Sequence, residues 1–349
     1  MNTSSTYSQW MALRASEPEL RALDIAGRLG ITEAELVHSA VGQSDAVSAI
    51  RLRGPFTDIL AGFASLGPMK ALTRNPHAVC EIIGTYPKLE LVGPSMAQTV
   101  GEIDLRAFLG HWTHAYAVTE ATKRGERRSI QFFDRSGRAI HKAYVTPDTD
   151  LQDLDRLVDQ HRHENLDEEL AIEPAESSRF DRPDSEIDVE ALRRDWLAMR
   201  DTHDFYPLLQ RLRLDRVQAL RLAGKDLARP VAAFAAGTML RKAAESETPI
   251  MVFVANPALV QIYIGPVRNV VPLHGWLNIL DPKFNLHLRP EAVHSAWIVR
   301  KPTPDDTVTS LELYDESGEL IVTFFGERHE GQKEQAAWRS ILDALPAAD

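Results

Sequence analysis

Hydrophobic residues recur at helical spacing in two separate parts of the chain, one near the N-terminus and one near the middle. Such spacing places the apolar side chains on one face of an amphipathic helix, so each series predicts a group of helices. Thr32 is a candidate N-cap, because its hydroxyl can accept a backbone N–H at a helix start. The positions concerned are Trp10, Leu13, Leu20, Leu23, Ala26, Leu29 and Ile31–Leu36, and later Trp196–Leu197 and Leu214–Leu220.

Short apolar segments follow the predicted helices in both parts of the chain. They are rich in β-branched and aromatic residues and are bounded by turn residues, which is typical of β-strands. Asp134–Gly137 and Asp315–Gly318 predict hairpin turns in which glycine is left-handed. A closing helix is predicted in each part, over Leu151–Val158 and Trp338–Leu345. The strands predicted in the second part are Met251–Val254, Val260–Ile264, Ala296–Val299 and Leu311–Tyr314.

The two parts are copies of one another. Gly84 and Gly265, Ala115 and Ala296, and Gly137 and Gly318 are each separated by 181 positions, with similar neighbours at each place. A constant offset of this kind indicates an internal repeat. Helices followed by antiparallel strands and a closing helix predict the α+β class. We therefore predict a tandem duplication, each half a large antiparallel sheet with flanking helices. The predicted divisions are an N-terminal repeat over 1–165, an acidic linker over 166–188 and a C-terminal repeat over 189–349.

Composition narrows the possible functions. Of the 349 residues, 44% are hydrophobic, but no apolar run approaches the roughly 20 residues of a membrane helix. The N-terminus shows no basic segment followed by an apolar one, so no signal peptide is visible, and one cysteine, Cys80, excludes an intramolecular disulfide. These features predict a cytoplasmic protein without membrane insertion. The net charge of −11 argues against nucleic acid as the ligand, because phosphate binding needs a basic surface.

Two segments resemble a known family. The first contains Trp196, residues 201–209 with the sequence Asp-Thr-His-Asp-Phe-Tyr-Pro-Leu-Leu, and Arg216; the second is 73–79, Thr-Arg-Asn-Pro-His-Ala-Val. They are similar to segments of the HemS/ChuS/PhuS family of cytoplasmic haem-trafficking or hemin-degrading proteins of Gram-negative bacteria. The resemblance extends over nearly the whole chain, including the duplication. It implies a fold of two similar lobes and one haem in a cleft beside the helices of the second lobe.

The resemblance also implies roles for single residues. His203 matches the axial ligand of the haem iron, Arg216 matches an arginine near the haem, and Lys301 and Arg328 match basic residues that face the propionates. His77 matches a histidine that one branch of the family uses, which makes it a candidate second or transient ligand reaching the cleft from the other lobe. Some members have further histidines beside the axial one, and this chain has none there.

The chemistry of these residues can be compared between the copies. A noncovalent haem needs an imidazole for iron, cations for two carboxylates and apolar walls, for which Phe205, Tyr206, Phe324 and Phe325 are candidates. At the aligned positions the first copy has Glu17 for His203, Glu120 for Lys301 and Pro147 for Arg328. Only the second copy therefore carries the ligating and basic set. There is no Cys-x-x-Cys-His motif, so a covalent c-type haem is excluded, and the resemblance then implies noncovalent haem b.

Simpler interpretations exist for each residue. The chain has 12 histidines, and most histidines in proteins bind no metal. His77 follows a proline and is also suited to starting a helix. The alternative for Arg216 is a surface ion pair with Asp215 or Asp226, and the alternative for Lys301 and Arg328 is simple solvation.

Two function classes follow from the resemblance. In the first, the protein carries haem during bacterial haem uptake and iron acquisition and delivers it to a haem oxygenase, its expected partner. In the second, it is a haem-degrading enzyme that opens the porphyrin ring and releases iron. The same axial histidine, His203, serves both functions, so the sequence leaves the choice open.

Overall fold

The computed structural model describes residues 3–165, 169–175, 179–180, 182–304, 306–328 and 332–348. Within them, the strands form two nine-stranded sheets. The chain divides into two compact units, the first made of Met1–Arg74, Glu81–Glu176 and Asn256–Gln261, and the second of Asn75–Cys80, Ser177–Ala255 and Ile262–Asp349. The predicted linker at 166–188 lies partly outside the described residues. No helix of the described part is long and apolar enough to cross a membrane.

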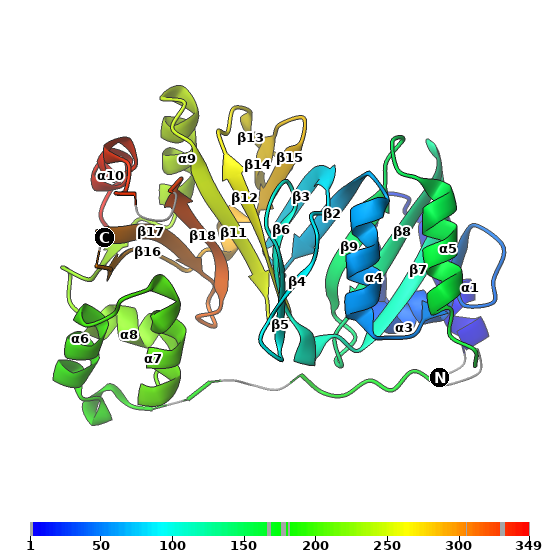
Figure 1. Cartoon of the computed structure of the whole chain (residues 1–349), viewed down its shortest axis with the longest axis horizontal. Helices are drawn as coiled ribbons and strands as arrows, with labels where there is room; N and C mark the ends of the chain where they lie inside the picture. The colour runs from blue at the N-terminus through cyan, green and yellow to red at the C-terminus, as the bar shows by residue number, and fades with distance from the viewer. Residues whose placement is uncertain are drawn as a thin grey trace. The chain divides into compact units, whose positions relative to one another are not determined.

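Five of the strands of the first unit lie side by side in the order β1-β7-β8-β9-β2, with antiparallel neighbours. Helices α1 to α3 pack on one face, in a cluster with Trp10, Tyr116 and Phe133, and α4 and α5 lie on the other face (Figure 1). The helices are α1 (Thr3–Ser16), α2 (Ala22–Leu29), α3 (Glu33–His38), α4 (Phe56–Gly62) and α5 (Leu151–His161). The strands are β1 (Val47–Leu52), β2 (Pro68–Arg74), β3 (Ala78–Thr85), β4 (Glu90–Val92), β5 (Met96–Thr99), β6 (Asp104–Phe108), β7 (His114–Thr122), β8 (Gly125–Phe133) and β9 (Ala139–Val145).

The second unit repeats this plan in the order β10-β16-β17-β18-β11. Helices α6 to α8 lie on one side of β16–β18, and α9 and α10 lie on the other (Figure 1). The helices are α6 (Val189–Leu197), α7 (Phe205–Leu212), α8 (Arg216–Leu222), α9 (Ala235–Glu245) and α10 (Ala336–Asp343). The strands are β10 (Ala228–Val231), β11 (Ile250–Asn256), β12 (Leu259–Gly265), β13 (Val270–Leu273), β14 (Trp276–Leu280), β15 (Phe284–Leu288), β16 (Ser295–Pro302), β17 (Thr307–Tyr314) and β18 (Leu320–Gly326).

The local signals behind these elements are those predicted from the sequence. Thr32 caps α3, since its hydroxyl accepts the backbone N–H of Glu35. Gly137 and Gly318 are left-handed, with φ of 76° and 81°, and close the two predicted hairpins. The predicted α+β class, with a duplicated antiparallel sheet and flanking helices, is confirmed.

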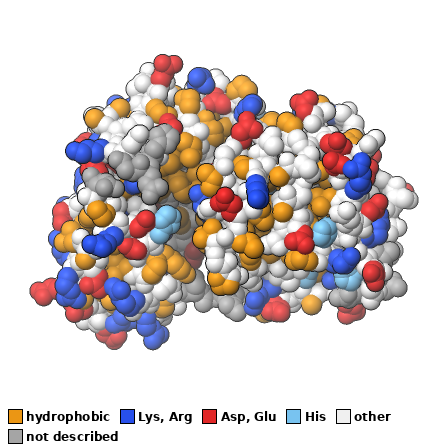
Figure 2. Space-filling model, in the orientation of Figure 1, with side chains coloured by type: hydrophobic (Ala, Val, Ile, Leu, Met, Phe, Trp, Pro, Cys, Tyr) orange, Lys and Arg blue, Asp and Glu red, His pale blue; other side chains and the backbone are white. Residues whose placement is uncertain are grey.

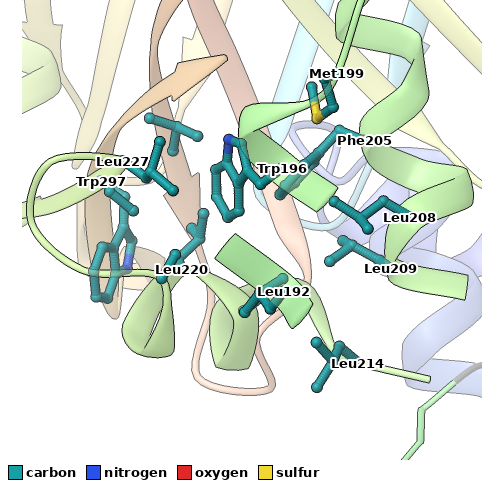
Figure 3. Packing of buried hydrophobic residues seen from close by; sticks show 14 of the residues in the cluster. Leu192, Trp196, Met199, Phe205, Leu208, Leu209, Leu214, Leu220, Leu227 and Trp297 are labelled. Atoms are coloured by element: carbon teal, nitrogen blue, oxygen red, sulfur yellow. The ribbon is translucent and has the colours of Figure 1, made fainter. Parts of the chain in front are cut away.

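A hydrophobic core holds helices α6 to α8 against the sheet of the second unit (Figure 3). Trp196 is fully buried, and its indole N–H donates to the carbonyl of Arg300 on β16 over 2.9 Å. The centroid of the Phe205 ring lies 4.5 Å from that of the Trp196 ring, and the two ring planes meet at 60°. Aromatic side chains contribute the largest buried areas per residue, so these two rings fix the start of α7 on the sheet.

Candidate functional site

His203 lies in a single 3-10 turn, Thr202–Asp204, immediately before α7. The Asp201 carboxylate accepts the backbone N–H of His203 over 2.8 Å and also lies 2.6 Å from its ring Nδ1. Asp204 closes the turn by accepting the backbone N–H groups of Arg200 and Asp201. The backbone hydrogen bond from His203 lowers the pKa of Asp201, which therefore stays ionised.

This geometry selects one nitrogen of the imidazole. In the neutral ring, Nδ1–H donates to the Asp201 carboxylate, so the lone pair is on Nε2. The His203 side chain is 92% exposed, and Nε2 is accessible. A carboxylate behind a histidine is the usual support of a metal-ligating imidazole, because it fixes the tautomer and raises ligand basicity. The pair is suited to binding a metal at Nε2.

Arg216 and Lys301 meet at one buried carboxylate, and we call this group the Glu312 cluster. Glu312 on β17 is fully buried and accepts two hydrogen bonds from Arg216, from Nε over 3.0 Å and from Nη2 over 2.9 Å. Lys301 donates from Nζ over 2.8 Å. The remaining donors are the hydroxyls of Ser310 and Tyr314.

The Glu312 cluster contains two cations and one anion. Burial raises the pKa of Glu312, but the charges of Arg216 and Lys301 outweigh this effect and hold it well below its ordinary value. Burial lowers the pKa of Lys301, although Glu312 opposes the change. With Glu312 ionised and both bases protonated, the cluster has one net positive charge. The Arg216 side chain is 27% exposed, whereas that of Lys301 is 4% exposed, so Arg216 is the cation accessible from outside.

Phe205 connects the histidine turn to the Glu312 cluster. Its ring centroid lies 5.3 Å from the Arg216 guanidinium carbon and 4.8 Å from Lys301 Nζ. Of the four aromatic residues expected to form walls, Phe205 and Phe324 are buried in the core and present no free ring face. Tyr206 is exposed, and Phe325 is half-buried beside Phe253. Figure 2 shows several Lys and Arg side chains over helices α6–α8, despite the negative net charge.

No hydrogen bond or ion pair among the described residues joins Arg328 or His77 to the Glu312 cluster. Arg328 follows β18, is half-buried, and has no hydrogen-bond or ion-pair partner among the described residues. His77 lies in a turn closed by Asn75, and its Nε2 is 3.4 Å from Oδ2 of Asp315. Its Nδ1 is buried and has no partner in the described part of the chain.

The first repeat contains a similar ion cluster with its charges at other positions. Glu33, the first residue of α3, is buried and pairs with Arg74 and Lys142. In the second repeat the first residue of α8 is the base Arg216. Each repeat thus uses a buried acid and two bases to join a helix to its sheet. The cluster therefore serves the scaffold in both repeats and does not by itself indicate a binding site.

The histidine turn, in contrast, has no counterpart in the first repeat. His203 lies two residues before α7, and the residue two before α2 is Leu20. The sequence alignment placed Glu17 there, because it used the spacing of Trp10 and Trp196, which the following helices do not keep. Sequence reasoning also missed Asp201 and Glu312. The available signals were an acid at the N-cap position of the turn and an acid between Leu311 and Leu313 in a buried strand.

Comparison with known proteins identifies the family. The family model described as "Haemin-degrading HemS.ChuX domain" matches residues 30–161 and again 213–345. The chain belongs to this family. Among curated members it is 39% identical to the hemin transport protein HemS of Yersinia enterocolitica and 40% identical to HmuS of Yersinia pestis, each over 346 residues. These alignments cover 99% and 98% of the chain, and 98% and 97% of the relatives.

Solved structures of family members have the same fold. Holo-PhuS, described as a heme-binding protein from Pseudomonas aeruginosa, is 41% identical with a TM-score of 0.96, and the match covers 100% of both chains. ChuS of Escherichia coli O157:H7, described as a heme degrading enzyme, is 38% identical with a TM-score of 0.92, covering 99% of this chain and 100% of that one.

Proposed function

We propose that this protein binds haem through Nε2 of His203. The observation that carries the proposal is the exposed imidazole whose Nδ1 is held by Asp201, a feature that only the second repeat has. The donor set fits haem, because one neutral imidazole is a common axial ligand and leaves the other axial position of the iron open. Similarity to holo-PhuS and to the hemin transport protein HemS supports the same assignment.

The cations of the second repeat suit the two propionates. Arg216 donates from Nε and Nη2 to Glu312, which leaves Nη1 outside that pair on a side chain that is 27% exposed. Arg328 has no partner among the described residues and is the second candidate contact. Lys301 is bound to Glu312 and buried, so it contributes positive charge beneath the site rather than a direct hydrogen bond. Tyr206 and Phe325 are the candidate walls.

The haem is expected to be noncovalent haem b. The chain has one cysteine, Cys80, which is buried in β3, and no Cys-x-x-Cys-His motif. Binding therefore depends on His203, the cations and apolar contact. His77 remains a candidate transient ligand, and its Nε2 would have to leave Asp315 before it could bind iron.

Within this function, we propose that the protein holds haem in the cytoplasm during iron acquisition and delivers it to a haem oxygenase. Its similarity to two hemin transport proteins supports delivery. Degradation of haem by the protein itself is the second candidate, supported by its similarity to ChuS. Both roles use His203, and they differ in whether the porphyrin ring is opened in the absence of an oxygenase.

One experiment distinguishes the two roles. The haem complex is incubated aerobically with a reductant and catalase, and its spectrum is followed. Delivery predicts an intact Soret band, followed by rapid transfer when a haem oxygenase is added in a stopped-flow instrument. Ring opening that continues in the presence of catalase would contradict pure delivery and establish degradation.

His77→Ala tests the proposed transient ligand. If His77 binds the iron during release, this variant transfers haem more slowly, while its resting spectrum is unchanged.

A further inference from the structure

The first repeat contains a hollow beneath one of its helices. It has a volume of about 270 Å³ and lies between helix α5 and strands β1, β7 and β8. This is the face of the sheet that α5 covers in Figure 1, opposite the face that packs on α1–α3. None of the residues proposed for haem binding lines it.

The strand register places two different rows of side chains along the sheet side of the hollow, one apolar and one polar. Ile50, Ala117 and Ile130 lie side by side on β1, β7 and β8 and form an apolar row. Ser48, Thr119 and Arg128 form the next row, which is polar. The hydroxyls of Ser48 and Thr119 have no hydrogen-bond partner among the described residues. The hollow can therefore take an apolar chain at one end and hydrogen-bonding groups at the other.

Helix α5 adds carboxylates to the polar end. Asp155 pairs with Arg128, and Asp159 pairs with Arg162 over 3.2 Å. The Asp155 and Asp159 side chains are 60% and 71% exposed, so a ligand can replace or share their arginine partners at small cost. Leu154 and Val158 extend the apolar wall from the same helix.

The second repeat indicates what kind of group this space accepts. On β16, Ile298 and Arg300 take the places that Ala117 and Thr119 have on β7. On β10, Arg229 takes the place of Ile50, because Arg229 lies opposite Ile298 in the same way that Ile50 lies opposite Ala117. The two arginine side chains reach the end of helix α10. Arg229 donates to the carbonyl of Leu342 over 3.2 Å, and Arg300 lies 3.7 Å from the Asp343 carboxylate. In the second repeat, therefore, the space between the sheet and the helix is occupied by the side chains of Arg229 and Arg300, which are alkyl guanidinium groups.

We propose that the hollow of the first repeat binds a short-chain organic cation of the alkyl guanidinium class. Its alkyl part lies on Ile50, Ala117 and Ile130, and its guanidinium donates to the carboxylates of Asp155 and Asp159 and to the hydroxyls of Ser48 and Thr119. The ligand takes the place that Arg300 and Arg229 occupy in the second repeat. This site is separate from the proposed haem site and does not depend on it.

The test is calorimetric titration of the full-length chain with n-butylguanidinium. Two analogues of the same shape serve as probes of charge, namely neutral n-butylurea and the anion pentanoate. The site predicts one cation per chain and at least about tenfold weaker binding of the urea, because hydrogen bonds to charged groups are the stronger ones. Equal binding of n-butylurea, tighter binding of pentanoate, or no binding of n-butylguanidinium would overturn the proposal.

Two variants locate the site. Ala117→Ile introduces the residue of the second repeat and fills the hollow, so affinity falls at least about tenfold, while Ala121→Ile, on the same strand outside the hollow, leaves it unchanged. Asp159→Asn changes an exposed side chain, does not threaten the fold, and also weakens binding of the cation. Haem affinity stays at the wild-type value in all three. Wild-type cation affinity in both Ala117→Ile and Asp159→Asn would place the ligand elsewhere and contradict the assignment.

Discussion

At the scale of single residues, Asp201 decides which nitrogen of His203 faces outward. Asp201→Asn removes the negative charge but keeps a side chain of the same size in the turn. Supporting groups of this kind typically change metal affinity about 10- to 100-fold, so haem affinity is expected to fall by at least about tenfold. Absorbance titration measures it. Asp195→Asn, which removes a half-buried acid of α6 that pairs with Arg211, is the control. Equal affinities of the two variants would show that Asp201 does not support the ligand.

A substitution of Arg328 tests whether this residue contacts the haem propionates. Arg328→Ala should weaken haem binding about tenfold or more, since a hydrogen bond to a charged group contributes about 1.5–3 kcal/mol. Haem dimethyl ester, which lacks both carboxylates, should bind the variant and the wild type alike. Arg241→Ala, an exposed arginine of α9, is the control. A loss of affinity that is equal for haem and for its ester would argue against a propionate contact.

His141 makes the stability of the first repeat depend on pH. It is buried between Thr73 and Tyr86, and burial lowers its pKa to about 3. An unfolded histidine titrates near 6.5, so between about pH 6.5 and 3 the unfolded chain binds a proton that the folded chain excludes. Stability therefore falls as pH decreases through this window. Urea unfolding at pH 7.5 and 5.5 should show a smaller pH effect in His141→Gln. An equal pH effect in both proteins would contradict this account.

At the scale of elements, helices α6 to α8 depend on Trp196. Trp196→Ala should destabilise the protein by about 3–5 kcal/mol, which is usual for a buried tryptophan, and should also weaken haem binding because the His203 turn rests on this core. The repeat supplies a matched control in Trp10, which is equally buried in the first unit. Trp10→Ala should cost similar stability in urea but leave haem affinity unchanged. An equal loss of haem affinity in both variants would show that haem binding does not depend specifically on the packing of α6–α8.

The elements that could be predicted from the sequence are those with a local signal. The hydrophobic spacing, the Thr32 cap and the Gly137 and Gly318 turns act within a few residues, and all appear as expected. Strand β10 was not predicted, because it is short and contains Pro230, which removes a backbone donor. Helix α9 was also missed, since four of its six buried residues are alanine or glycine and only Met239 and Leu240 are large apolar residues.

The candidate site was less accessible to sequence reasoning. His203 and Arg216 could be selected through a family resemblance, but the pairing of Arg216 and Lys301 on Glu312 depends on strand register and helix packing. The burial of Phe205 likewise follows from its contact with Trp196. Arg216 and Glu312 are 96 positions apart, and no short pattern encodes their contact.

At the scale of the whole molecule, the duplication separates what the fold needs from what the function needs. Both repeats keep a buried acid with two bases, Glu33 in the first and Glu312 in the second. Features that differ between the repeats are the better candidates for function. They are the His203 turn in the second repeat and, in the first, the sheet residues under α5 that line the hollow.

The central claim, that His203 holds the haem iron, is tested most directly by titrating haem into wild type, His203→Ala and His111→Ala while the Soret band is recorded. His111 is a matched control, because it is also an exposed histidine in a single 3-10 turn. The account predicts that His203→Ala shifts the Soret band and binds haem at least about tenfold more weakly. The reason is that the variant loses the imidazole contact with iron, which is at least as strong as a charge-assisted hydrogen bond. His111→Ala should match wild type. A wild-type spectrum and affinity in His203→Ala would contradict the account.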